Sequence, residues 1–96
     1  MVSPDNKRFV TASMDLEAGY NPNEIQVWRL EPSGADLEYS ANFGEQWGPS
    51  DPFWKDAETI SFKKNVLDPG SPGQLLSAPA ILRRNENRWE LHIPPR

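Results

Sequence analysis

The sequence predicts a single all-β domain over residues 1–96. Ten prolines and six glycines are many for this length, and they disfavour long helices and favour short strands joined by turns. Several short segments also alternate between apolar and polar residues, which is typical of strands with one buried face. A chain of this size buries only about two thirds of its unfolded surface, so we expect a modest core that depends on aromatic side chains.

Three strands are expected in the first half of the chain. Their β-branched and aromatic alternation places them at Phe9–Met14, Glu24–Leu30 and Leu37–Phe43. A turn at 3–8 precedes the first strand, and a polar loop at 15–23 follows it. A five-residue turn at 32–36 contains Gly34 and joins the second and third strands, so these two strands are predicted to form a hairpin.

The third of these strands has the clearest alternation. The buried face is expected to carry Leu37, Tyr39, Ala41 and Phe43, and the solvent face Glu38, Ser40 and Asn42. This assignment assumes an uninterrupted period of two residues along the strand.

The second half repeats the plan after a connection at 44–52. Strands are expected at Glu58–Lys64, Gln74–Arg84 and Arg88–Ile93. The segment 65–73 is too rich in proline and glycine for regular structure, and 85–87 forms a turn. Pro79 interrupts its strand and therefore indicates a sheet edge or a bulge.

The two halves match at an offset of 51 residues, which pairs Asp5 with Asp56. Each half contains a strand, a loop and a hairpin, so the chain divides into units at 3–43 and 54–93 joined by 44–53. Periods of about 40 to 50 residues with several strands each are typical of propeller blades.

The segments Ser3–Val10, Asn23–Trp28 and Trp54–Phe62 resemble bacterial β-propeller repeats of the WD-repeat and TolB-like kind. The resemblance implies two blade-like units, with Asn6 where such repeats usually have glycine. Propellers close with at least about four blades. Two alternatives therefore stay open: a piece of a larger propeller-like protein, or a small sandwich or partly open barrel of about six antiparallel strands.

Charge and composition exclude several classes of partner. The formal net charge is −4, and an acidic surface is poor for nucleic acid because phosphate neutralisation supplies most non-specific affinity. The charge is uneven, with 4 basic and 11 acidic residues in 1–62 against 6 and 3 in 63–96. No apolar run approaches the roughly 20 residues that span a bilayer. We expect a soluble protein, periplasmic or secreted if a leader has been removed and otherwise cytoplasmic.

One loop carries enough oxygen ligands to be considered for calcium. Its candidate ligands are Asp15, Glu17, Asn21 and Glu24. Calcium prefers six to eight oxygens from carboxylates, amides and carbonyls. The spacing begins like an EF-hand loop but has Gln26 where the bidentate glutamate belongs. The alternative is a polar loop held by Asx-type turns, with no cofactor.

An aromatic cluster formed by Trp47, Phe53 and Trp54 is the main candidate for binding. Exposed aromatic rings flanked by glycine and proline form flat platforms for a sugar or a proline-rich segment. The alternative is that these rings cover a small core that lacks apolar volume.

Catalysis has weak support in the sequence. Asp51, Asp56 and Glu58 lie near two tryptophans, as in a glycosidase, but turn chemistry alone explains such carboxylates. The single histidine, His92, falls on the expected solvent face. There is no cysteine to act as nucleophile.

The sequence therefore favours a non-catalytic interaction or structural module related to propeller repeats. Open strand edges present unpaired backbone groups, so we expect a protein partner or self-association, such as a homodimer, through these edges. The alternative function is a carbohydrate-binding module that stacks sugars on Trp47, Phe53 and Trp54.

Overall fold

A computed structural model describes residues 1–16 and 18–93. These residues form seven strands and no helix, so none of them belongs to a helix that could cross a membrane. The strands are β1 (Arg8–Ser13), β2 (Glu24–Glu31), β3 (Gly34–Asn42), β4 (Gly48–Asp56), β5 (Thr59–Leu67), β6 (Leu75–Asn85) and β7 (Arg88–His92).

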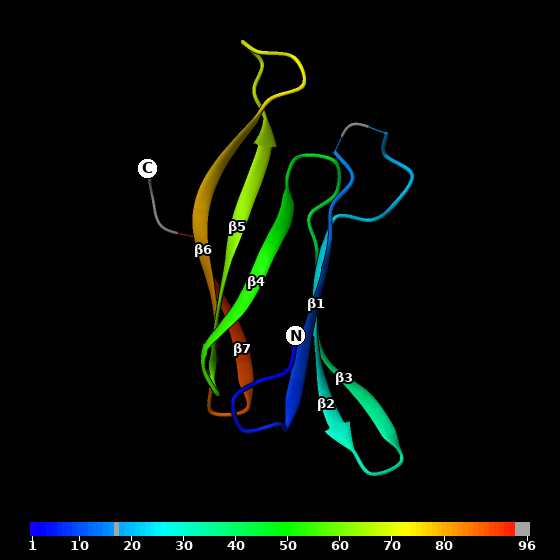
Figure 1. The fold of residues 1–96 in the computed structure, drawn as a ribbon, viewed down its shortest axis with the longest axis vertical. Coiled ribbons are helices and arrows are strands. Elements are labelled where there is room, and N and C mark those ends of the chain that lie inside the picture. Colours follow the sequence, from blue (N-terminus) through cyan, green and yellow to red (C-terminus); the bar gives the residue numbers. More distant parts are fainter. Residues whose placement is uncertain (17, 94–96) are drawn as a thin grey trace.

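Two antiparallel sheets pack against each other, and each follows the chain without a crossover. The first sheet has the order β1-β2-β3 and the second β4-β5-β6-β7 (Figure 1). We call them sheet A and sheet B, and β1 of sheet A lies beside β4 of sheet B. The all-β prediction is confirmed, and six of the strands lie where alternation placed them.

Strand β4 was not predicted, because its first five residues were assigned to the connection at 44–52. Pro49 and Pro52 lack the backbone N–H that a central strand donates, but an edge strand tolerates them. The register of β4 against β5 shifts between Ser50 and Phe53, and Asp51 has a φ of 52° within this bulge. The two prolines and the bulge remove the regular alternation from the sequence of β4, so only its pairing with β5 identifies it as a strand.

The hairpin turns are shorter than expected. The β2–β3 turn contains only residues 32 and 33, because β3 already begins at Gly34. The β6–β7 turn contains Glu86 and Asn87, whose φ angles are 50° and 70°. Two consecutive left-handed residues define a type I′ turn, whose twist matches that of the flanking strands.

The turns before β1 and β5 use the same bond at the predicted offset. Asp5 accepts a hydrogen bond from the backbone N–H of Lys7 (3.1 Å), and Asp56 accepts one from that of Glu58 (2.8 Å). The two strands begin at residues 8 and 59, so their starts lie 51 residues apart. Both turns therefore have the same local cause, an aspartate that binds the backbone two residues ahead.

The core lies between the facing sides of the two sheets. Its buried apolar side chains come from β1 and β2 on one side and from β5, β6 and β7 on the other. They are Val10, Ile25, Val27, Ile60, Phe62, Ala80, Leu82 and Trp89. The inner face of each sheet is the face that contributes to this core, and the outer face is the opposite one.

A bulge in β3 overturns the predicted faces of that strand. Val27 pairs with Tyr39 and Trp28 pairs with Leu37, so Glu38 is the extra residue between them. The bulge directs Glu38 inward to Trp89 and leaves Leu37 on the outer face, half exposed. The prediction had placed Leu37 inside and Glu38 outside, because a strict period of two cannot register an inserted residue.

Candidate interaction surfaces

Trp47 packs at the junction of the two sheets. Its ring stacks on Phe43 with centroids 3.7 Å apart and on Phe62 with centroids 6.5 Å apart. The ammonium group of Lys64 lies 5.2 Å from the ring centroid, within cation–π range. Trp47 is only partly buried, yet one face of its indole covers the core.

Trp54 is on the inner face of β4, where it pairs with Ile60. Its ring meets Trp89 edge-on, with centroids 6.0 Å apart and planes at 68°. Its indole N–H donates to the backbone carbonyl of Met1 at 3.0 Å. Both the ring and its polar atom therefore have partners within the chain.

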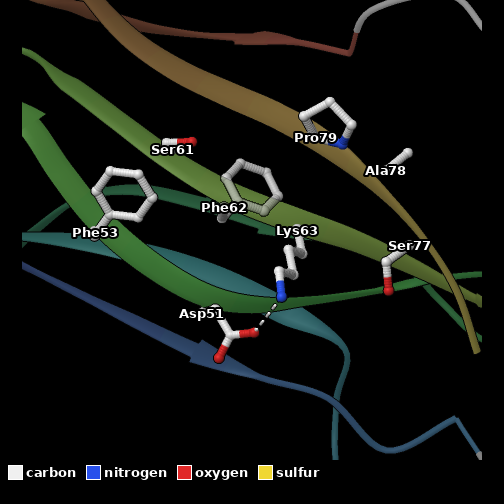
Figure 2. A pocket seen from close by; sticks show the side chains of 8 residues that line it. All are labelled: Asp51, Phe53, Ser61, Phe62, Lys63, Ser77, Ala78 and Pro79. Atoms are coloured by element: carbon white, nitrogen blue, oxygen red, sulfur yellow. Dashed lines mark ion pairs between the residues drawn. The ribbon is translucent and has the colours of Figure 1, made fainter.

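Phe53 lies on the opposite face of the same strand, on the outer face of sheet B. It is 48% exposed and lines a cavity of about 390 Å³ together with Ser61, Ser77 and Pro79 (Figure 2). An ion pair between Lys63 and Asp51, 3.5 Å long, lies beside it. Of the three aromatic residues singled out from the sequence, Trp47 and Trp54 thus pack against the core and Phe53 lies on the outer face, so the three do not form one platform.

A row of apolar side chains crosses the outer face of sheet A. The cross-strand pairs are Val2 with Phe9, Phe9 with Trp28, and Trp28 with Leu37. Paired residues of antiparallel strands point to the same side, and the neighbours of Phe9 are buried on the other side. The rings of Phe9 and Trp28 are stacked with centroids 5.9 Å apart and planes at 6°. We call these four residues the outer row of sheet A.

Two members of the outer row are half exposed: Val2 and Leu37, at 50% each. The sequence alone did not predict this surface, because the row is formed only by the register of four chain segments and by the bulge in β3. Phe9 shares its strand face with Thr11 and Ser13, opposite the apolar face that carries Val10, and this was a usable signal that one member of the row points outward.

Glu38 forms the centre of a polar cluster between the sheets. Its Oε1 accepts hydrogen bonds from Arg8 Nε (2.8 Å) and Trp89 Nε1 (2.6 Å), and Arg84 Nε lies 3.9 Å away. Desolvation raises the pKa of this carboxyl, but the bonds from Arg8 and Trp89 outweigh it and the pKa is lowered overall. Arg84 also reaches Glu58 at 3.6 Å. The cluster joins both sheets.

The loop considered for calcium is organised by Asp15. The two oxygens of this carboxylate accept hydrogen bonds from four successive backbone N–H groups, at residues 18 to 21. Burial raises the pKa of Asp15, but these four hydrogen bonds together lower it by more, so the pKa lies below its usual value. Asn21 also donates to Asp15, and Glu24 belongs to β2. Glu17 lies outside the described residues, among which no group of three acidic, histidine or cysteine side chains could hold an ion.

The carboxylates near the tryptophans each have a structural partner. Asp51 pairs with Lys63, Asp56 accepts the N–H of Glu58, and Glu58 pairs with Arg84. The hydrogen bond from Glu58 is the main reason that the pKa of Asp56 is lowered. His92 is exposed on β7 and lies 3.6 Å from Glu90. Of these groups, Asp51 also lines the cavity that contains Phe53.

Comparison with known proteins gives no relative from which a role could be transferred. No protein-family model matches the chain, and neither the curated proteins nor the solved structures include a significant match.

Proposed function

We propose that this chain is a non-catalytic interaction module, related to propeller repeats, that binds protein through the outer row of sheet A. The observation that carries the proposal is the row itself: four apolar side chains in register across the face of a sheet that does not need them for its core. Antiparallel sheets with one covered face usually present polar residues on the other. Contiguous exposed apolar surface marks binding sites.

The relation to propeller repeats rests on topology. Each sheet is an antiparallel meander, and the two stack face to face, as blades do. The Asp5 and Asp56 turns precede matching strands at the offset expected of a repeat.

A protein partner fits the row better than a polar ligand does. Val2 and Leu37 flank the stacked Phe9 and Trp28 pair with aliphatic side chains, which bury well against another apolar surface. Aromatic residues with aliphatic neighbours form the centre of many protein interfaces.

Site-specific cross-linking tests the proposal. A photoreactive phenylalanine analogue is placed at Leu37, and in a control at Tyr20, which is 88% exposed in the β1–β2 loop. In the native cells we expect one discrete protein adduct from position 37, lost on Trp28→Glu, and none from position 20. Equal labelling at both positions, or an adduct that survives Trp28→Glu, contradicts the proposal.

Carbohydrate binding is the second candidate, favoured by Phe53. Its exposed ring lines a cavity with its cross-strand neighbour Ser61 and, at the far end, with Ser77. A sugar stacks on such a ring while its hydroxyls bind polar groups like these. Titration with soluble glycans, followed by the chemical shifts of Phe53 and Ser61, tests it. Chemical-shift changes that are confined to this cavity and abolished by Phe53→Ala support sugar binding. If none of the glycans tested changes these shifts, the carbohydrate-binding hypothesis is wrong.

A further inference from the structure

The partner of the outer row can be named by comparing the two sheets. On the inner face of sheet B, the pairs Trp54 with Ile60, Ile60 with Leu82, and Leu82 with Leu91 form a row across four strands. The outer row of sheet A also crosses four chain segments in the same antiparallel order. Ile60 lies 51 residues after Phe9, at the offset that matches the two turns.

The corresponding rows face opposite ways within the molecule. The row of sheet B is buried against sheet A, whereas the corresponding row of sheet A points outward. Sheet A therefore exposes the kind of surface that sheet B buries. In the same way Val10, buried on the inner face of sheet A, corresponds to Ser61 on the outer face of sheet B.

We propose that the partner is a second copy of this chain, whose sheet B docks its outer face on the outer row of sheet A. This inference rests on the proposed function and names its partner. Within each copy, sheet A stacks on sheet B, and the proposed contact repeats this stacking between one copy and the next. It is head to tail, because two different faces meet.

Shape and charge favour this pairing of faces. The outer face of sheet B carries the cavity lined by Phe53 and Pro79, which can receive a protruding apolar row. Residues 8–42, which contain sheet A, hold 2 basic and 6 acidic side chains, whereas residues 48–92, which contain sheet B, hold 6 of each. A head-to-tail contact places the acidic sheet A against a sheet of balanced charge, whereas a contact of sheet A with sheet A opposes like charges.

The described strand edges are poorer docking sites than the faces. The β3 edge contains the bulge at Glu38, the β4 edge contains two prolines, and β7 has only five residues. Bulges, prolines and short strands are the devices that block edge pairing. Strand β7 pairs only with residues 81–85 of β6, and the stretch of β6 that it leaves unpaired contains Pro79. On the β1 edge, residues Met1 to Ser3 pair with β1 through bonds such as Val10 N–H to Met1 O (2.9 Å).

Complementation between two face variants tests the proposal. Trp28→Glu damages the outer row of sheet A, and Phe53→Glu damages the outer face of sheet B. Tyr20→Glu is the control, since Tyr20 is exposed in a loop away from both faces. Mass is measured by sedimentation over a range of protein concentrations, and circular dichroism checks that each variant is folded. If Trp28→Glu does not fold, Leu37→Glu replaces it.

We expect the wild type and Tyr20→Glu to associate into species of at least twice 10.9 kDa, and each face variant alone to be monomeric. An equimolar mixture of the two variants should form a 1:1 dimer and nothing larger, because each supplies the face that the other lacks. If the wild type associates but the mixture of the two face variants forms no dimer, the head-to-tail contact is wrong, and association occurs through strand edges or through like faces. If the wild type is monomeric, the partner is not a second copy of this chain. The proposed function would still stand if the cross-linking experiment then gave an adduct of another protein at position 37.

Discussion

Trp89 of β7 donates its indole N–H to Glu38 of β3 at 2.6 Å, which joins the last strand of sheet B to the last strand of sheet A. The same oxygen accepts from Arg8 of β1. Glu38 is 18% exposed in its side chain and is thus mostly withdrawn from water. A bond this short to an ionised acceptor is stronger than one between neutral groups.

Replacing Glu38 should separate its charge from its hydrogen bonds. Glu38→Ala leaves Arg8 and Trp89 without their acceptor, and we expect it to lower the free energy of unfolding by about 3 kcal/mol. Glu38→Gln retains an amide oxygen in the same place and should cost about 1 kcal/mol. Urea denaturation measures both. Equal losses in the two variants would show that the charge alone matters.

The stability of the domain should fall in acid, and Glu38 should contribute to the fall. The pKa of Glu38 is lowered below its usual 4.5 by Arg8 and Trp89, against the desolvation that raises it. The unfolded chain therefore takes up the proton first as pH decreases, so the contribution is complete above about pH 4.5 and is lost below it.

Thermal unfolding between pH 3 and pH 7 measures this dependence. Asp5, Asp15 and Asp56 also have lowered pKa values, so Glu38→Gln should reduce the slope without abolishing it. An unchanged slope in Glu38→Gln contradicts the assignment.

Two phenylalanines on adjacent strands should respond very differently to truncation. Phe62 is buried in the core, and Phe62→Ala should cost about 3 to 5 kcal/mol by the cavity it leaves. Phe53 is half exposed on the outer face, and Phe53→Ala should cost about 1 kcal/mol or less. Chemical denaturation of the two variants makes the comparison. A larger loss at Phe53 would contradict the assignment of inner and outer faces.

Gly48 should not tolerate a side chain. A Cβ at this position would meet the side chain of Met14, and it would lie 2.9 Å from Asn23 Oδ1. Gly48→Ala should therefore destabilise the domain by about 1 to 3 kcal/mol through overpacking. Adding Met14→Ala should recover part of the loss, which a double-mutant cycle detects. Additive losses would place the strain elsewhere.

The β6–β7 turn offers a stabilising substitution. Glu86 has a φ of 50°, a conformation that asparagine adopts more readily than glutamate. Glu86→Asn should raise the midpoint of thermal unfolding by an amount equivalent to about 0.5 to 1 kcal/mol. Glu86→Gln is the control and should leave it unchanged, because glutamine gains no such preference. A destabilised Glu86→Asn would contradict this account of the turn.

Local rules were sufficient where a segment follows one pattern. Alternation located β2, β5 and β7 to within a few residues, because each is a regular strand with one buried face. Asp5 was identified as a turn residue from local chemistry and Asp56 from its match to Asp5 at the offset of 51 residues, and the backbone bonds bear both out.

Local rules failed to predict features that depend on the pairing between strands. β4 is a strand despite two prolines because β5 pairs with it. Phe53 and Trp54 belong to different surfaces although they are consecutive in β4, because one face of that strand lies on the core and the other in solvent.

The sequence by itself determined the all-β class, most strands and the turns, since these depend on neighbours within a few residues. The tertiary structure decided that Glu38 faces inward to Trp89 and Leu37 outward beside Trp28. One inserted residue in β3 sets both, and only the pairing of β3 with β2 reveals it. The outer row of sheet A depends on that insertion, because a face is defined by register between strands that are distant in the chain.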